Sequence, residues 1–431
     1  MLLLVAVAVL GMGFYLVRFV VFGHEWASAP FNQTVYRRGL LVTGTLTDRN
    51  GVVLASVTDG VRTFAESRDV RRATLHTVGD LQGNIGTGAL TVYASDMIGY
   101  SFFTGSYSRT GEGSTTALTI DSKLNVEAFK ALNGRRGVVM VSNYKTGEVL
   151  CMVSNPSFDP DDPPADVSGP SFEGVYLNRA ISSAYTPGSV YKLLTAAAAI
   201  EKTGDVYDRV FECTGELKTG LGSLTCPRVH GNIGFERGVE LSCNIVFGEL
   251  ALELGADTLA EYAGKYGLSG RLEVGGIITA RGNFDKAGPD TANLAWSGVG
   301  QYNNTVCPAA MLRFVGAVAN NGNAAEMFLL KKSGVQFLLP ASTTRIMNRN
   351  TAVLLGELME LQSSSFPGLQ LHAKSGTAQV GRDTEPHAWY TGYITNDNFP
   401  LAFVVVVENG GSGTAVAGPV ANRVLQAAVN G

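Results

Sequence analysis

The chain has 431 residues, which is enough for more than one domain and a large hydrophobic core. Lysine and arginine together number 33 and aspartate and glutamate 37, so the net charge of −4 gives no basis for a nucleic-acid partner. Glycine is abundant at 52 residues, and the composition is otherwise that of a globular, turn-rich protein.

The amino-terminal segment is apolar enough to enter a membrane. Residues 2–17 carry no charge, and the apolar run resumes after Arg18 as far as Phe22. About 20 apolar residues span a bilayer, and Arg18 can extend to the interface, so residues 1–22 are predicted to be a single transmembrane anchor. The alternative is a cleavable signal peptide, because residues 27–29 read Ala-Ser-Ala, although the apolar run is long for that purpose. Arginines follow this segment rather than precede it, so charge alone does not predict an outside carboxyl-terminal domain.

Residues 23–125 are predicted to form a small β-rich amino-terminal module, or pedestal. Short β-like runs occur at residues 40–47, 52–57 and 89–94, separated by turn-rich segments. Asp48-Arg-Asn-Gly51 is a strong turn signal between the first two runs.

Residues 126–431 are predicted to form a mixed α/β (α+β) domain. An antiparallel sheet flanked by helices, with an all-helical subdomain, accounts for the pattern of elements. The expected elements are a β-hairpin at 137–153, apolar helices at 189–203, 241–267 and 305–320, strands within 388–407 and a closing helix at 416–429.

Ser189 is a candidate nucleophile because Lys192 follows it by three residues. If Pro187-Gly188 opens a helix, both side chains lie on one face of its first turn. A serine hydroxyl needs a neighbouring base, and a buried lysine with a lowered pKa can serve. Ser142 and Lys145 have the same spacing, but they lie in the predicted hairpin with the lysine at its tip.

Two further segments could complete a serine acyl-transfer site. Ser242 and Asn244 form the only Ser-x-Asn in the chain: Ser242 could relay a proton and Asn244 could bond both the lysine and a substrate amide. The alternative is that Ser242 caps a helix. In the second segment Lys374 offers a positive charge for a carboxylate, and the residues after it could assist: the hydroxyls of Ser375 and Thr377, and the close backbone approach that Gly376 permits.

The Lys-Ser/Thr-Gly triplet is common in this chain, so context decides which copy matters. Four other copies begin at Lys145, Lys202, Lys218 and Lys332. Only the copy at 374–377 follows Ser242 and comes just before the closing pair of strands.

Five cysteines are present. Cys213 and Cys226 bracket a glycine-rich stretch and could form a disulfide in an oxidising compartment. Cys151, Cys243 and Cys307 stand apart and are expected to be small core residues. No cysteine and histidine have zinc-ligand spacing, so neither a metal site nor a cofactor is predicted.

The three motifs, in this order, resemble those of class B penicillin-binding proteins, the monofunctional peptidoglycan D,D-transpeptidases of the penicillin-recognising serine acyltransferases. The flanking residues strengthen the resemblance: Asn178-Arg-Ala180, Val299-Gly-Gln301, His387-Ala-Trp389-Tyr390 and the segment from Asp48 to Ala55.

The resemblance implies a catalytic cycle. Ser189 would attack the penultimate D-Ala carbonyl of a stem peptide with Lys192 as general base, and the acyl group would pass to an amine on a neighbouring strand. Lys374, Ser375 and Thr377 would hold the terminal carboxylate. The N–H groups of Ser189 and of either Thr377 or Ala378 would form the oxyanion hole. β-Lactams would acylate Ser189 as substrate mimics.

The resemblance also implies a location and a partner. The catalytic domain would lie on the extracytoplasmic side of the cell membrane, and a membrane-embedded glycan polymerase would be the partner. Three other functions, on a related fold or with related chemistry, fit the sequence less well. A β-lactamase lacks support because no Glu-x-x-Leu-Asn follows Ser242, a sensor would carry further transmembrane segments, and a Ser-His-Asp hydrolase would carry a Gly-x-Ser-x-Gly.

Overall fold

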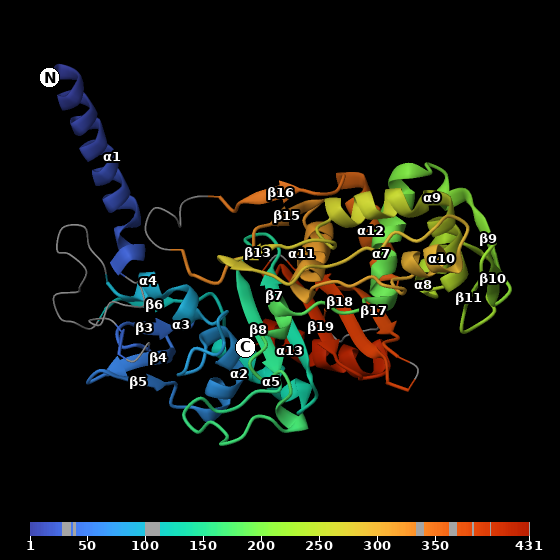
Figure 1. The fold of residues 1–431 in the computed structure, drawn as a ribbon. Helices are drawn as coiled ribbons and strands as arrows, with labels where there is room; N and C mark the ends of the chain where they lie inside the picture. Colours follow the sequence, from blue (N-terminus) through green and yellow to red (C-terminus); the bar gives the residue numbers. More distant parts are fainter. Residues whose placement is uncertain are drawn as a thin grey trace.

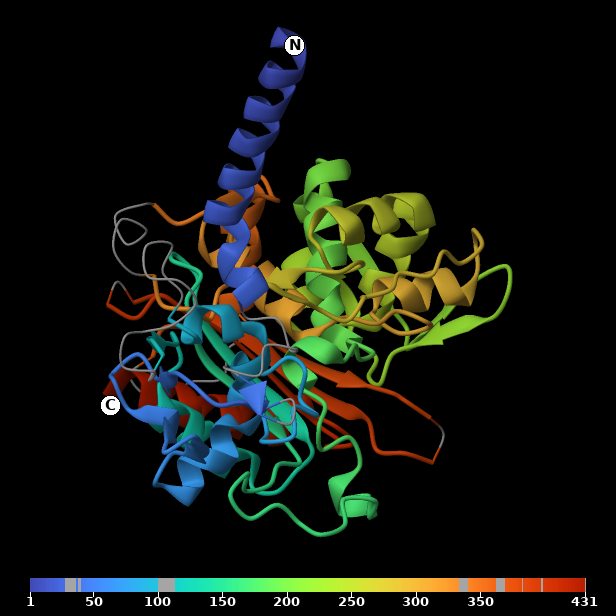
Figure 2. The same cartoon turned by 60° about the vertical axis from the view of Figure 1, so that its left-hand side comes forward.

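The computed structural model describes residues 1–27, 36–37, 40–99, 113–332, 340–361, 369–381, 383–396 and 398–430. Helix α1 (Leu2–Ala27) projects away from the rest of the molecule (Figures 1 and 2). Among the described residues, α1 alone is long and apolar enough to cross a membrane, with 21 residues of mean hydropathy 2.3 that are 0% buried. Its length and composition fit the predicted anchor, and a signal sequence would have the same properties.

A five-stranded antiparallel sheet forms the centre of the large domain, in the order β17–β18–β19–β7–β8 (Figure 1). The predicted hairpin is confirmed as β7 (Gly137–Asn143) and β8 (Val149–Asn155). The remaining strands are β17 (Leu371–Ala378), β18 (His387–Ile394) and β19 (Leu401–Val407). Lys374 pairs with Thr391, which places the last motif on the edge strand of the sheet.

Helices cover both faces of this sheet, which explains why β19 is apolar throughout. Val405 and Val407 face a core formed with α5 (Ser122–Leu132) and α13 (Gly418–Asn430). Val404 and Val406 belong to the opposite core, formed with α11 (Pro308–Ala319) and α12 (Arg349–Glu360). Because alternate side chains of a strand point to opposite faces, a strand buried on both faces has no polar positions.

A mainly helical lobe lies beside the sheet. It contains α7 (Lys192–Lys202), α8 (Phe235–Glu240), α9 (Asn244–Lys265) and α10 (Ala292–Gly298). The prediction of an all-helical subdomain is wrong in detail, because two antiparallel strand pairs belong to this lobe: β9 (Val210–Cys213) with β12 (Gly231–Gly234), and β10 (Glu216–Lys218) with β11 (Ser223–Thr225). The predicted helix at 241–267 begins only at Asn244, because Ser242 has a left-handed backbone with φ of 52°.

The pedestal contains a four-stranded sheet in the order β5–β4–β3–β6. Its strands are β3 (Thr45–Thr47), β4 (Val53–Thr58), β5 (Val61–Phe64) and β6 (Thr115–Ala117), flanked by α2 (Arg68–Val78). The β-like run at 89–94 is a wrong prediction, because the chain forms α3 (Ala89–Val92) and α4 (Ala94–Met97) there. Ala89, Tyr93 and Met97 are buried four residues apart, which is helical spacing, and a short apolar run does not distinguish a strand from a buried helix.

Short elements complete the described chain. They are β1 (Tyr36–Arg37), β2 (Leu40–Leu41), η1 (Pro170–Phe172), α6 (Arg179–Ser182), η2 (Gly188–Tyr191), η3 (Val206–Asp208), β13 (Glu273–Val274), β14 (Ile277–Ile278), β15 (Asn323–Ala325), β16 (Thr343–Arg345) and the π-helical turn η5 (Gly413–Ala417).

The carboxylate of Asp48 joins the turn between β3 and β4 to the start of α5, the helix that packs on the central sheet. One oxygen accepts hydrogen bonds from the backbone N–H groups of Asn50 (2.8 Å) and Val52 (2.9 Å), which forms the predicted turn between β3 and β4. The other accepts from the hydroxyl (2.7 Å) and N–H (3.1 Å) of Ser122, at the start of α5. Asp48 is 1% exposed, so these four bonds replace water around a buried charge.

We expect Asp48→Ala to lower the free energy of unfolding by at least about 2 kcal/mol, because it leaves buried donors unpaired both in the β3–β4 turn and at the start of α5. Thermal unfolding would measure the loss. Glu66→Ala is the matched control, since Glu66 is an exposed acidic residue of the same pedestal. Equal midpoints for the two variants would contradict a joining role for Asp48.

Candidate active site

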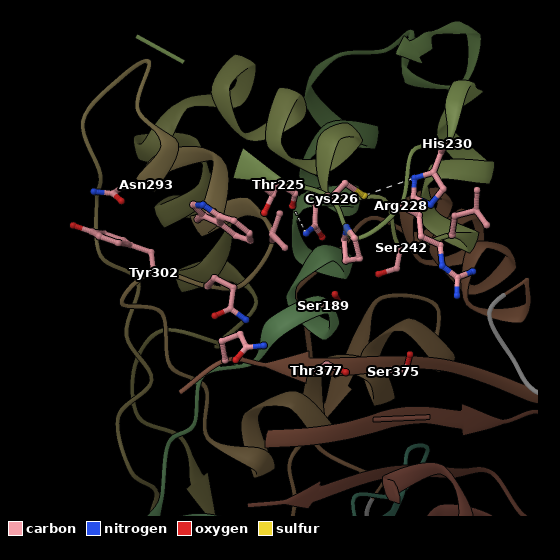
Figure 3. Close-up of a pocket in the computed structure, with 17 residues that line it drawn as sticks. Ser189, Thr225, Cys226, Arg228, His230, Ser242, Asn293, Tyr302, Ser375 and Thr377 are labelled. Carbon is pink, nitrogen blue, oxygen red and sulfur yellow. Dashed lines mark hydrogen bonds between the residues drawn. The ribbon is translucent and has the colours of Figure 1, made fainter. Parts of the chain in front are cut away.

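A cleft of about 790 Å³ contains five of the predicted site residues in its wall. They are Ser189, Ser242, Asn244, Ser375 and Thr377. Figure 3 shows Ser189 between the turn that carries Ser242 and the strand that carries Ser375 and Thr377. Lys192 and Lys374 lie beneath this surface, and each is 1% exposed.

Ser189 lies in the 3₁₀ turn η2, directly before α7, and tight packing holds this turn. Gly188 has a φ of 56°, and its N–H donates to Gly300 O at 2.8 Å. A Cβ on Gly188 would lie 2.7 Å from the carbonyl oxygen of Thr377 on β17. The indole N–H of Trp389 on β18 donates to Thr186 O at 3.0 Å. The prediction of a helix start at Ser189 is therefore correct in place, although its first turn is 3₁₀.

Lys192 is held by three oxygens of the turn between α8 and α9. Its Nζ donates to the carbonyl oxygen of Ser242 at 2.6 Å and to Asn244 Oδ1 at 2.7 Å, and lies 3.2 Å from Ser242 Oγ. Burial lowers the pKa of Lys192 to about 7, against a smaller opposing effect of Cys243 and Cys226. In the described part of the chain no hydrogen bond joins Lys192 to Ser189. Lys192 therefore gives up its proton more readily than an ordinary lysine, and the Ser242 turn holds its amine in place.

Ser242 connects the two buried lysines. Its hydroxyl oxygen lies 3.2 Å from Lys192 Nζ and 3.0 Å from Lys374 Nζ. The N–H groups of Ser242 and Cys243 donate back to Val239 O and Gly238 O, which stabilises the left-handed turn. The residue at the N-cap of α9 is Cys243, so the alternative of Ser242 as a helix cap is wrong.

Asn244 uses both ends of its amide. Oδ1 accepts from Lys192, and Nδ2 donates to the carbonyl oxygen of Thr225 at 2.8 Å. The amide nitrogen carries two hydrogens, so one remains for a substrate group in the cleft.

The four residues at 374–377 occupy β17 with distinct environments. Lys374 donates to Ser242 Oγ and to Ser375 O, both at 3.0 Å, and its pKa lies well below the usual range because it is buried and close to Lys192. A Cβ on Gly376 would lie 2.9 Å from Pro187 O, so only glycine lets β17 approach η2 this closely. Ser375 and Thr377 line the cleft.

Several residues that line the cleft were not predicted from the sequence as site residues. Arg228 and His230 come from the segment between β11 and β12, while Asn293, Trp296 and Tyr302 come from α10 and the turn after it. Val299 and Gln301 belong to the quoted segment Val299-Gly-Gln301, and Cys226 was named only as a candidate disulfide partner.

The flanking segment Asn178-Arg-Ala180 has a structural role. Arg179 Nε donates to Glu408 Oε1 at 2.8 Å, and the hydroxyl of Tyr185 donates to the same oxygen at 2.8 Å. This pair of bonds fixes the segment before Ser189 to the end of β19.

The competing Ser142/Lys145 pair lies where the sequence predicted. Ser142 is in β7, and Lys145 is exposed in the turn between β7 and β8. Neither residue lines the cleft.

Comparisons with known proteins point to one family. The sequence model described as "Penicillin binding protein transpeptidase domain" matches residues 137–426. The peptidoglycan D,D-transpeptidase PbpA of Mycolicibacterium smegmatis is 30% identical over 382 residues, covering 76% of this chain and 74% of that protein. The crystal structure of PBPA from Mycobacterium tuberculosis matches with a TM-score of 0.77 and 24% identity over 90% of this chain and 99% of that one. The ceftriaxone acyl-enzyme of penicillin-binding protein A from M. tuberculosis matches with a TM-score of 0.74 and 25% identity, over 90% of this chain and 98% of that one.

We expect Gly188→Ala to destabilise the protein by more than Gly204→Ala. Both glycines have left-handed φ values, of 56° and 70°, but a Cβ at Gly204 meets no atom within 4 Å. Gly204→Ala therefore measures the backbone cost alone, about 1–2 kcal/mol. Gly188→Ala adds the clash with Thr377 O. Thermal unfolding of the two variants would compare these costs, and equal midpoints would show that η2 and β17 can separate freely.

Proposed function

The chain belongs to the penicillin-binding protein transpeptidase family. We propose that Ser189 is the nucleophile on which its acyl-enzyme forms. The protein is a class B penicillin-binding protein, a serine-type peptidoglycan D,D-transpeptidase inhibited by β-lactams. One observation supports the assignment of Ser189 above all: it shares a cleft with the Ser242 turn and β17, under which Lys192 and Lys374 meet at one hydroxyl.

Acylation begins when Ser189 Oγ attacks the penultimate D-Ala carbonyl of a stem peptide. Lys192 takes the hydroxyl proton, as its pKa of about 7 leaves much of it neutral at physiological pH. A neutral amine has two hydrogens, and the two shortest bonds, to Ser242 O and Asn244 Oδ1, account for both. Its lone pair remains for the serine proton.

The leaving D-Ala amine needs a proton, and Ser242 can deliver it. The Ser242 hydroxyl lies within hydrogen-bond distance of both lysine amines, so a proton taken up by Lys192 can move through it to the cleft. The C–N bond breaks, D-Ala leaves, and the acyl group stays on Ser189 Oγ. An amino group of a neighbouring strand then attacks this ester, forms the cross-linking amide and releases the serine.

The terminal carboxylate of the stem peptide binds beside Lys374, Ser375 and Thr377. Burial and Lys192 hold the pKa of Lys374 well below its usual range, and an arriving carboxylate opposes both effects by favouring the charged amine. The hydroxyls of Ser375 and Thr377, which line the cleft, donate to the same group.

The oxyanion hole consists of the N–H groups of Ser189 and Thr377. Thr377 O lies next to Gly188, so this carbonyl faces η2 and not β18. The N–H and C=O of one strand residue point to the same side, so Thr377 N–H also faces η2. This favours Thr377 over Ala378, the two candidates that the sequence left open.

The boundaries and the location follow the same proposal. Residues 1–22 anchor the protein in the membrane, residues 23–125 form the pedestal and residues 126–431 form the transpeptidase domain. The catalytic domain is extracytoplasmic, where its peptidoglycan substrate lies. A membrane-embedded glycan polymerase is the proposed partner.

Fluorescent penicillin should label the wild-type protein and not Ser189→Ala, because the label is an ester of the catalytic serine. Ser142→Ala is the matched control, since it removes the competing Ser-x-x-Lys serine and should label like the wild type. In-gel fluorescence would measure the bound label. Labelling of Ser189→Ala would refute the assignment, and rapid loss of label with release of hydrolysed penicillin would favour a β-lactamase.

Lys192→Ala should lower the acylation rate constant by at least about 100-fold, the usual contribution of a general base. Lys145→Ala should leave this rate unchanged, because Lys145 lies in the hairpin turn outside the cleft. Stopped-flow acylation by a chromogenic cephalosporin would measure both rates. Similar losses in the two variants would sink the role proposed for Lys192.

A further inference from the structure

Three cysteines and a histidine that are distant in sequence meet beside the cleft. Cys213 ends β9, Cys226 and His230 lie between β11 and β12, and Cys243 lies directly before α9. Their sulfur and nitrogen ligand atoms all lie within 4.8 Å of one another. Figure 3 shows Cys226 and His230 side by side at one end of the cleft. Cys243 was expected to stand alone in the core, and the structure corrects that expectation.

The spacing of these atoms fits a tetrahedral metal ion. Zinc binds cysteine sulfur at about 2.3 Å and histidine nitrogen at about 2.0–2.1 Å, so a tetrahedron has edges of roughly 3.8 Å between sulfurs and 3.5 Å from sulfur to nitrogen. Cys226 Sγ lies 3.9 Å from Cys243 Sγ. His230 Nδ1 lies 3.4 Å from Cys213 Sγ and 3.7 Å from Cys226 Sγ. Each of these three distances is within a few tenths of an ångström of the tetrahedral value.

The same distances do not fit a disulfide. The sulfurs of a disulfide are about 2.05 Å apart, and all five cysteines are free thiols. The predicted Cys213–Cys226 disulfide is therefore not formed. A disulfide would also use only two of the four ligands, and it would not explain the position of His230.

Zinc binding would release the protons of all three thiols to solvent. Among the hydrogen bonds it would replace are those from Cys213 Sγ to Arg228 O (3.5 Å) and from Cys226 Sγ to Cys243 Sγ (3.9 Å).

We propose that Cys213, Cys226, His230 and Cys243 bind one Zn²⁺ ion in an S₃N site. With four protein ligands the site is closed, as in structural zinc sites, so the ion carries no water for catalysis. The ion joins β9 and the segment between β11 and β12 to the turn that holds Lys192, because Cys243 lies between Ser242 and Asn244. This site is additional to the proposed acyl-transfer chemistry and does not depend on it.

The ligand spacing explains why the sequence did not indicate this site. Twelve residues separate Cys213 from Cys226, three separate Cys226 from His230, and twelve separate His230 from Cys243. Zinc sites are usually recognised by two cysteines two to four residues apart. Here β9 and the turn before α9 supply one cysteine each, and the segment between β11 and β12 supplies a cysteine–histidine pair.

Metal analysis of the full chain, purified in detergent with reductant and without chelator, would test the proposal. We expect about one zinc per chain by mass spectrometry of the metal content, the stoichiometry of one S₃N site. Cys213→Ser should lose most of it. Cys307→Ser is the matched control, because Cys307 is a buried thiol outside the cluster and serine can keep its bond to Ala180 O. Cobalt exchanged into the wild type should show the sulfur-to-cobalt charge-transfer absorption of a thiolate site.

A second measurement covers the case in which the cysteine variant does not fold. A zinc chelator should lower the thermal midpoint of the wild type, and added Zn²⁺ should restore it. Absence of zinc together with a midpoint unaffected by chelator would overturn the proposal. A Cys226–Cys243 disulfide found by peptide mapping of the metal-free wild type would overturn it as well. Both measurements count or displace zinc directly, so neither depends on acylation of Ser189.

Discussion

Two buried lysines without a carboxylate partner set the requirements of this active site. In the described residues, the ion pairs of the protein include neither Lys192 nor Lys374, and both are 1% exposed. Burying a charged amine costs several kcal/mol, and the protein avoids much of that cost by lowering both pKa values. Neutral oxygens then suffice as partners. The left-handed turn at Ser242 supplies them, because it exposes a carbonyl and a hydroxyl side by side.

The rest of the fold keeps that turn opposite Ser189 and β17. Backbone approaches that only glycine permits, at Gly188 and Gly376, bring η2 against the edge strand. The same edge strand presents Lys374 to Ser242 from the other side. The site is therefore assembled from three elements whose spacing is set by backbone contact and not by long, adaptable side chains. Such rigidity suits a reaction in which charge develops at one carbonyl oxygen between two N–H groups.

The sequence predicted secondary structure correctly where the apolar periodicity of a segment, or the residues of a single turn, determine that structure locally. The hairpin at 137–153, the turn at Asp48 and the apolar β19 are examples, since each follows from local alternation or turn residues. It failed where tertiary contacts decided. The run at 89–94 is helical because Tyr93 and Met97 pack into a core that the segment itself does not reveal. The left-handed Ser242 is likewise held by bonds to Gly238 and Val239 and by two distant lysines.

The proposed metal site would explain how a turn with this strain persists next to the cleft. Ser242 and Cys243 are adjacent, so a ligand bond from Cys243 to an ion shared with Cys213 and Cys226 would restrain the backbone of the turn. A left-handed serine costs about 1–2 kcal/mol relative to the right-handed region, and the lysine bonds depend on that conformation. Hydrogen bonds to neutral amines contribute only about 1 kcal/mol each. A zinc site, whose binding free energy is about 10 kcal/mol or more, would provide a margin large enough to hold Lys192 in place for its proposed role as general base.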